Sequence, residues 1–284
     1  MKTLFANIED VWREAAARWT LVAYFFLSTI FIIIFASAIN LDIVDGALAG
    51  AKLFGKEVDM SGDEISLQKL VLGFESGFSV FLYFVCTFLA IFATAHLVPR
   101  MQEKGTIDLY LSRPVGRVRL LLSRYVAGLM LAATNVIYLM GAVWLIVAWK
   151  TNVLNPRFLL SAAIIMLVIA TLLAFAFLVG VVTSSTAVSI MTTYGIFFFG
   201  LMLAAHDKIA AAVSKEWQAW LIQTLYWVFP KSAELGQAVV AFVAGEQLPA
   251  RVSAVLTPAP FVTTAAFGIG CLILASWLFT KKEF

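Results

Sequence analysis

The side chains best suited to specific chemistry in this sequence are basic residues that stand between two long apolar runs. Six of them fall within residues 99–125, namely Arg100, Lys104, Arg113, Arg117, Arg119 and Arg124. Only Glu103 and Asp108 oppose them in this segment. A guanidinium group presents several N–H donors in a planar fork that suits carboxylates and backbone carbonyls. The segment therefore predicts a binding surface and not a catalytic centre.

A short helix is expected inside this segment. Gly105 and Thr106 open it, with Thr106 as the N-cap and Asp108 in the first turn, where the helix dipole favours negative charge. Leu109 belongs to its apolar face. Pro114 ends it, because a proline disfavours helical geometry in the residue before it. The pattern indicates a compact helix and turn that meets another surface.

One stretch imitates a phosphate-binding loop. Gly50 and Gly55-Lys56 have the spacing of such a loop, but Glu57 follows where Ser or Thr must hold magnesium. No other nucleotide-binding signature occurs in the sequence. Any ATP chemistry is therefore expected in a partner.

Cysteine and histidine provide no further site. Cys86 and Cys271 both fall inside apolar runs, where small buried hydrophobic side chains are expected and not a disulfide or a metal pair. His96 is a lone histidine near the end of an apolar run, and we interpret it as an interfacial side chain. No metal site is predicted.

The composition identifies a polytopic membrane protein. Of 284 residues, 62% are hydrophobic and 13% are charged, whereas soluble domains carry about 25% charged residues. The net charge of +3 is small and scattered, so nucleic acid is not expected as a partner.

The apolar runs predict an all-α membrane fold of six spans within a single domain, residues 1–284. The spans are expected at about 19–39, 77–98, 126–149, 158–182, 187–205 and 260–279. The uncharged run from 158 to 206 must hold two of them, because one helix of that length would exceed twice the hydrocarbon thickness. Its break is expected at residues 183–186, where hydroxyl groups can satisfy the turn.

Between and before the spans, the sequence predicts surface elements. Residues 1–18 have the spacing of an amphipathic interfacial helix. Residues 40–76 form an acidic loop that includes Glu75. Residues 206–257 are expected to be an extracytoplasmic interfacial or re-entrant region, with clustered tryptophans and an apolar stretch at 232–244 that is too short to span.

The charge distribution predicts the orientation. With 1–18, 99–124 and 280–284 on one side, that side has 11 basic and 6 acidic residues, against 9 and 11 on the other. The positive-inside rule then places both termini and the basic segment in the cytoplasm.

The motif itself resembles a known family. Glu103-Lys104-Gly105-Thr106, followed by Leu109-x-Leu111-Ser112-Arg113-Pro114-Val115-x-Arg117, is similar to a loop of ABC type-2 permeases. More narrowly, it resembles permeases of multicopper-enzyme maturation, such as those that serve nitrous-oxide reductase. The resemblance implies that 99–125 is a cytoplasmic coupling loop whose helix docks on a separate ATPase. The residues it implies at that interface are Glu103, Gly105, Thr106, Leu109, Arg113, Pro114 and Arg117.

The resemblance also implies a connecting helix at 1–18 and short external helices between the fifth and sixth spans. In this hypothesis the chain is an exporter permease in the cytoplasmic (inner) membrane, not an enzyme, and pairs with a second permease copy as a homodimer. It binds no cofactor itself, while ATP and Mg²⁺ are expected on the ATPase partner. Membrane lipid and periplasmic or accessory proteins are the other partners considered.

Two alternatives are weighed against it. A stand-alone secondary transporter or channel usually has ionisable residues within its spans, and the expected spans contain essentially none apart from His96. A membrane enzyme would need a cluster of catalytic groups, which the sequence does not show. The apolar spans favour a lipidic, amphiphilic or peptide cargo, and nothing in the sequence indicates copper.

Overall fold

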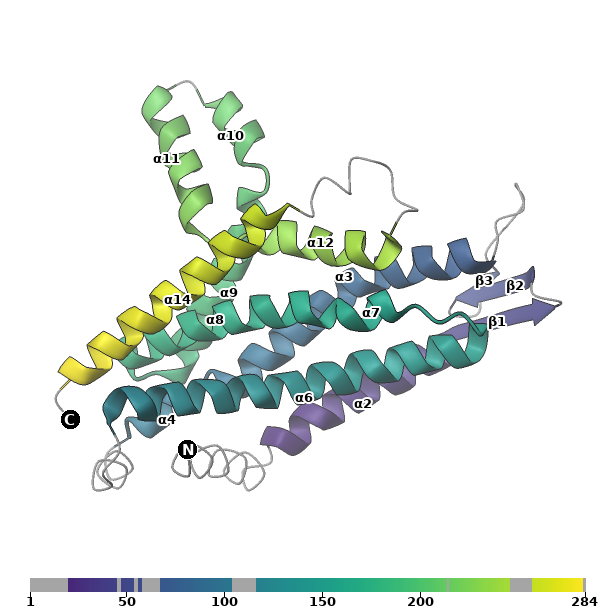
Figure 1. Ribbon diagram of the computed structural model, residues 1–284, viewed down its shortest axis with the longest axis horizontal. Coiled ribbons are helices and arrows are strands. Elements are labelled where there is room, and N and C mark those ends of the chain that lie inside the picture. Colours follow the sequence, from purple (N-terminus) through teal and green to yellow (C-terminus); the bar gives the residue numbers. More distant parts are fainter. Residues whose placement is uncertain are drawn as a thin grey trace.

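The computed structural model describes residues 20–44, 47–53, 56–57, 67–103, 116–213, 215–245 and 257–282. This part of the chain is predominantly helical, as predicted, with three short strands that were not (Figure 1). Its elements are α2 Thr20–Ala38, β1 Ile39–Val44, β2 Ala47–Leu53, β3 Lys56–Glu57, α3 Leu67–Thr94, α4 Leu97–Met101, α6 Arg117–Thr151, α7 Pro156–Leu160, α8 Ala162–Thr183, α9 Thr186–Leu203, α10 His206–Ala212, α11 Glu216–Val228, α12 Ser232–Ala244 and α14 Pro258–Lys281.

Five described helical stretches are long and apolar enough to cross a membrane. They are Val71–Met101, Arg117–Thr151, Pro156–Thr183, Thr186–Leu203 and Pro258–Lys281. The side chains of α2 are described from Val22 to Ser37, and over that length it is a shorter apolar helix. The chain is thus a multi-pass membrane protein, and the sixth span stays a prediction. The predicted helix at 1–18 lies outside the described residues.

Phenylalanines join α2 to α3. Phe74, Phe78 and Phe81 lie on one face of α3 because residues four and three apart are neighbours on a helix. Phe78 packs against Phe35 of α2 with ring centroids 4.4 Å apart, and Phe81 packs against Phe31 at 5.2 Å. Phe74 continues this contact before residue 77, with its ring centroid 6.2 Å from that of Phe35, and α3 begins at Leu67 and not at the predicted residue 77.

Helix α6 also begins earlier than predicted. It starts at Arg117 and not at residue 126, so Arg119 and Arg124 lie on the helix and not in a loop. Leu120 and Leu121 are buried in the core, which continues the apolar face into the basic region. Long arginine side chains can bury their apolar stems while the charged heads reach toward polar surroundings.

The long uncharged run is divided at the segment that the sequence analysis chose. Ser184 adopts the left-handed conformation with φ of 53°, and its N–H donates to the Gly180 carbonyl at the end of α8. Ser185 then caps α9, its hydroxyl accepting from the Val188 N–H at 3.5 Å. Helix α8 packs against α3, α6, α9 and α14, which makes it the centre of the bundle.

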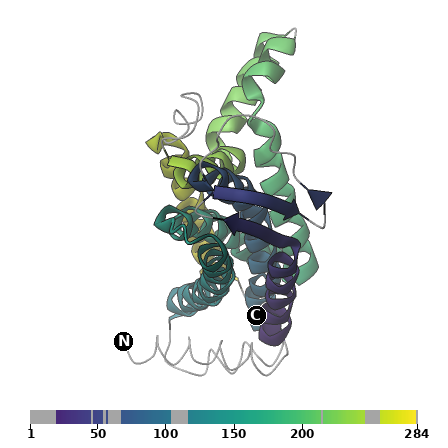
Figure 2. The same cartoon turned by 90° about the vertical axis from the view of Figure 1, so that its right-hand side faces the viewer.

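The segment predicted as an acidic loop contains a small antiparallel sheet. Its order is β1-β2-β3, and it lies at one end of the bundle (Figure 2). Gly50 lies inside β2, paired with Asp42 of β1, and Lys56 belongs to β3. Gly50 and Lys56 thus lie within antiparallel strands, which agrees with discarding them as a phosphate loop.

Among the described residues between α9 and α14 there are three shorter helices. Helices α10 and α11 form a hairpin that projects from the bundle (Figure 1). Helix α12 covers the same thirteen residues as the predicted short apolar stretch. It is fixed to α3 by Tyr83, whose buried hydroxyl donates to the Ser232 carbonyl at 2.7 Å.

Candidate functional site

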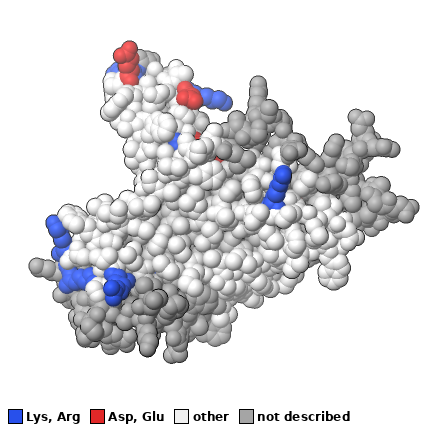
Figure 3. Space-filling view, viewed as in Figure 1, with Lys and Arg blue, Asp and Glu red and all other residues white. Residues whose placement is uncertain are grey.

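The candidate site is the end of the bundle where α4, the start of α6, the α8–α9 turn and the end of α14 meet, which we call the basic end. Figure 3 shows Lys and Arg side chains gathered over this end. The described basic residues there outnumber its one described acidic residue, Glu103. They are Arg100, Arg117, Arg119, Arg124, Lys281 and Lys282. Two of the predicted interface residues, Glu103 and Arg117, are described there, whereas Gly105, Thr106, Leu109, Arg113 and Pro114 lie outside the described residues.

Helix α4 brings the chain to this end. The sequence predicted that Pro99 would end the second span, but Pro99 lies inside α4. A proline is tolerated in the first turn of a helix, where its missing N–H would have no intrahelical partner. Pro99 also packs on α8, since a Cβ added at Gly180 would lie 3.1 Å from the Pro99 Cδ. The absence of a side chain at Gly180 therefore allows the close approach of α4 to α8.

Gln102, directly after α4, continues this contact through hydrogen bonds. Its Nε2 donates to the Gly180 carbonyl at 2.9 Å, and its Oε1 accepts from the Ser184 hydroxyl at 3.1 Å. The same Oε1 accepts from Lys282 Nζ at 2.7 Å. One amide side chain thus joins the end of α4, the end of α8 and the residue after α14.

Lys282 completes this arrangement. Its Nζ donates to three acceptors: Gln102 Oε1, the Val181 carbonyl at 2.7 Å and the Ser184 hydroxyl at 2.8 Å. An ammonium group has three donors, so these bonds use all of them. Partial burial lowers the pKa of Lys282 from its ordinary value. We call Gln102, Ser184, Lys282 and the carbonyls of Gly180 and Val181 the Lys282 cluster.

Arg117, the first residue of α6, contacts the end of α14. Its Nη1 donates to the Lys282 carbonyl at 2.8 Å and to the Thr280 carbonyl at 3.2 Å. The last carbonyls of a helix have no intrahelical donors and carry partial negative charge. Arg117 therefore caps the end of α14, a structural role that the sequence reasoning did not assign to it.

Arg100 differs from these paired cations. Its Nη1 is buried and has no hydrogen-bond partner among the described atoms. Buried donors are rarely left without an acceptor in native proteins.

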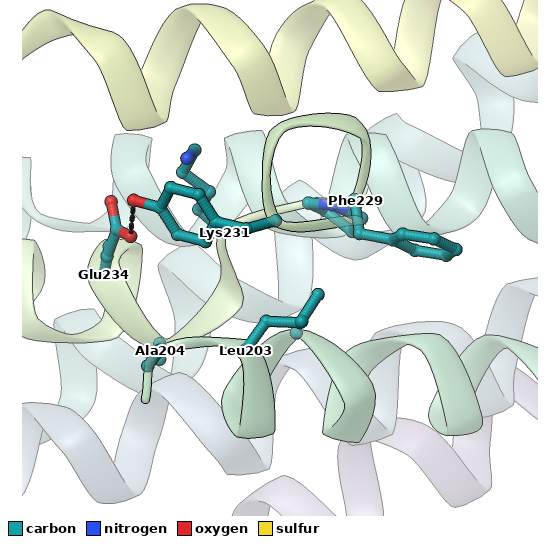
Figure 4. A pocket seen from close by; sticks show the side chains of 9 residues that line it. Leu203, Ala204, Phe229, Lys231 and Glu234 are labelled. Atoms are coloured by element: carbon teal, nitrogen blue, oxygen red, sulfur yellow. Dashed lines mark hydrogen bonds between the residues drawn. The ribbon is translucent and has the colours of Figure 1, made fainter. Parts of the chain in front are cut away.

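A second polar cluster lies at the base of the α10–α11 hairpin (Figure 4). The Tyr226 ring stacks on His206 with centroids 3.6 Å apart, and Lys231 Nζ lies 3.2 Å from its centroid. His206 and Lys231 are both too close to the Tyr226 ring to lie on the same face of it, so the ring lies between them. The Tyr226 hydroxyl donates to Glu234. The pKa of Tyr226 is raised mainly by burial and also by the Glu234 carboxylate.

Tyr226, Lys231 and Glu234 line a narrow pocket together with Leu203 and Ala204, and this pocket has no room for a water molecule. The lining side chains fill the pocket, so it is not a substrate cavity. Their contacts, such as that of Tyr226 with Glu234, hold the α10–α11 hairpin against α12. This cluster was not predicted, because the sequence of 206–257 shows a tryptophan-rich composition but not the pairing of Tyr226 with Glu234.

One buried carboxylate also contradicts a prediction. Glu75 was placed in the acidic loop, but it lies on α3 and is only 2% exposed. Its Oε2 accepts from Asn155 Nδ2 at 2.7 Å, while its Oε1 has no hydrogen-bond partner among the described residues. Arg124 on α6 is equally buried. The long helices therefore contain ionisable residues that the predicted spans lacked.

Comparison with known proteins adds one match. The model of a family described as ABC-2 family transporter protein matches residues 11–284. A search of curated proteins found no match. The matched range includes both sides of the basic segment and every described helix.

Proposed function

The chain belongs to the ABC-2 transporter family, and on this premise we propose that it is the permease of an ABC exporter driven by a separate cytoplasmic ATPase subunit. The family makes it a membrane transport subunit that is not itself catalytic, and it implies an ATPase partner in general. The finer proposal includes six spans, cytoplasmic termini, the inner membrane and pairing of two permease copies as a homodimer. ATP and Mg²⁺ would bind to the partner. The narrower likeness to copper-enzyme maturation permeases stays a prediction from the motif.

The observation that carries the proposal is the convergence of both flanks of residues 104–115 on the basic end. Glu103 precedes this segment and Arg117 follows it, and both lie where α8 and α14 end. The unpaired donor of Arg100 lies on α4, at the same end. A surface rich in guanidinium donors fits an acidic or carbonyl-rich surface of a cytoplasmic partner.

In this mechanism, nucleotide binding closes the ATPase dimer and moves residues 104–115. The movement reaches α3 and α4 through Gln102 and Glu103, and it reaches α6 through Arg117. Both long helices extend across the bundle, so a displacement at the basic end would change their packing at the opposite end. A path for the cargo would open between the two protomers.

Charge reversal in the motif tests the proposal. Arg113→Glu is expected to abolish recovery of the ATPase with the purified permease. The substitution replaces a positively charged donor by a carboxylate, which an acidic or carbonyl-rich partner surface repels. Lys208→Glu is the matched control, since it reverses one charge on α10, away from the basic end. Equal recovery of the ATPase with Arg113→Glu and with the control would refute the interface.

Buried Glu75 favours a second candidate function, a secondary transporter that works alone. Ionisable residues inside membrane spans often mark ion or proton pathways. If Glu75 couples transport to a proton, liposomes containing the permease without ATPase will show proton flux, and Glu75→Gln will remove it. If neither the parent nor Glu75→Gln shows proton flux, and transport becomes ATP-dependent once the ATPase is added, the exporter is the correct function.

A further inference from the structure

Both flanks of the 104–115 segment are fastened to the end of α14: both contact Lys282, and the trailing flank also contacts Thr280. Gln102, on the leading flank, accepts from Lys282 Nζ at 2.7 Å. Arg117, on the trailing flank, donates to the carbonyls of Lys282 and Thr280. These contacts join residues 180 and 165 positions apart in the sequence. A displacement of either flank therefore pulls on α14 without passing through the bundle core.

The turn between α8 and α9 is part of the same unit. Lys282 donates to the Val181 carbonyl and Gln102 to the Gly180 carbonyl, both in the last turn of α8. Ser184 stands in the turn and exchanges hydrogen bonds with both side chains. The tight contact of Pro99 with Gly180 keeps α4 and α8 from sliding past each other.

We propose that Lys282 and Gln102 are positioning residues that join the end of α14 and the α8–α9 turn to the flanks of residues 104–115, so that these parts move as one body. Force applied to residues 104–115 then reaches α8, α9 and α14. This inference rests on the proposed function for the source of the force. The linkage itself is a property of this chain and can be measured without a partner.

Lys282→Met is the decisive variant, because it keeps the apolar stem and removes all three donors of Nζ. Lys281→Met is the matched control: its Nζ lies 4.0 Å from the Trp277 ring centroid and outside the Lys282 cluster. Ser184→Ala is a milder variant that leaves Lys282 two of its three acceptors. If Lys282→Met does not fold, Ser184→Ala carries the test.

The first measurement is the distance between spin labels at exposed Ile273 of α14 and exposed Met191 of α9, in lipid nanodiscs. Buried Cys86 and Cys271 are replaced by alanine in every variant. We expect one narrow distance distribution for the parent and Lys281→Met, a broad one for Lys282→Met, and an intermediate one for Ser184→Ala. Equal widths in Lys282→Met and the parent, or in Ser184→Ala where only that variant folds, would overturn the inference.

The second measurement uses the permease with its captured ATPase, trapped by ATP and vanadate. The parent and Lys281→Met are expected to keep the 191–273 distance unchanged on trapping, because both labels lie in the linked body. In Lys282→Met this distance is expected to shift on trapping, while the ATPase is still recovered. An unchanged distance in trapped Lys282→Met would also overturn the inference. If the parent recovers no ATPase, the proposed function fails, and the first measurement still decides the linkage.

Discussion

Replacing Gly200 by alanine is expected to destabilise the protein, although alanine is the better helix former. Gly200 lies on α9 where this helix touches the chain between α11 and α12. A Cβ added there would lie 2.6 Å from the Pro230 carbonyl oxygen and 2.8 Å from the Ser232 Oγ. Real Cβ atoms essentially never approach closer than 3.0 Å, so α9 and the Pro230 backbone must separate by several tenths of an ångström.

The size of the effect follows from two opposing terms. Alanine in place of a helical glycine stabilises by about 1 kcal/mol, whereas one extra methyl group in a tight contact costs about 1–3 kcal/mol. The Ser232 hydroxyl can rotate away, but the Pro230 carbonyl cannot, since it is backbone and accepts from the Ser232 N–H at 3.0 Å. The clash is therefore expected to outweigh the gain in helix propensity.

Gly195→Ala isolates the clash. Gly195 lies on the same helix, and nothing comes within 4 Å of its added Cβ. The propensity gain is shared by both variants, so their difference in unfolding free energy measures the contact alone. We expect Gly200→Ala to be about 1–3 kcal/mol less stable than Gly195→Ala in thermal or denaturant unfolding in detergent. Equal stability of the two variants would show that α9 does not pack on Pro230.

Three further perturbations give distinct readouts. Tyr83→Phe removes the side-chain hydrogen bond to the buried Ser232 carbonyl and is expected to cost about 1 kcal/mol of stability in the same unfolding assay. Trp220, 68% exposed on α11, should be quenched by brominated lipids when it is the one tryptophan retained, and unquenched emission would place α11 away from the membrane interface. Burial and Glu234 raise the pKa of Tyr226, so its contribution to stability is present below about pH 10 and lost as pH rises; Tyr226→Phe should therefore reduce the alkaline fall in melting temperature, and an unchanged fall would contradict this.

The break in the long uncharged run was predictable from length and residue type. No single helix fits residues 158–206, and Ser184 and Ser185 supply the caps that the turn needs. The β-strand from Ile39 to Val44 was predictable too, because apolar residues at 39, 41 and 43 alternate with Asn40 and Asp42. The acidic residues of this segment, taken alone, predicted a loop instead.

Charge misled the helix boundaries for a physical reason. Glu75 and Arg124 were excluded from spans because isolated charges are costly in the membrane. In the structure each lies on a long helix, and Glu75 is covered by Asn155. A polar partner eighty residues away decides that burial, and no local pattern reveals it.

The Lys282 cluster could not be predicted, yet its composition has a simple cause. Helices α8 and α14 both end at the basic end, where their last carbonyls carry partial negative charge and lack donors. Arg117 and Lys282 satisfy these carbonyls from the neighbouring parts of the chain. The basic residues that predict a cytoplasmic orientation by the positive-inside rule therefore also fasten the helix ends together. Replacing these basic residues would change both the membrane orientation and the linkage between the helix ends. Lys282→Met and its control Lys281→Met separate the two effects. Each variant removes one positive charge, but only Lys282→Met removes the hydrogen bonds of the Lys282 cluster.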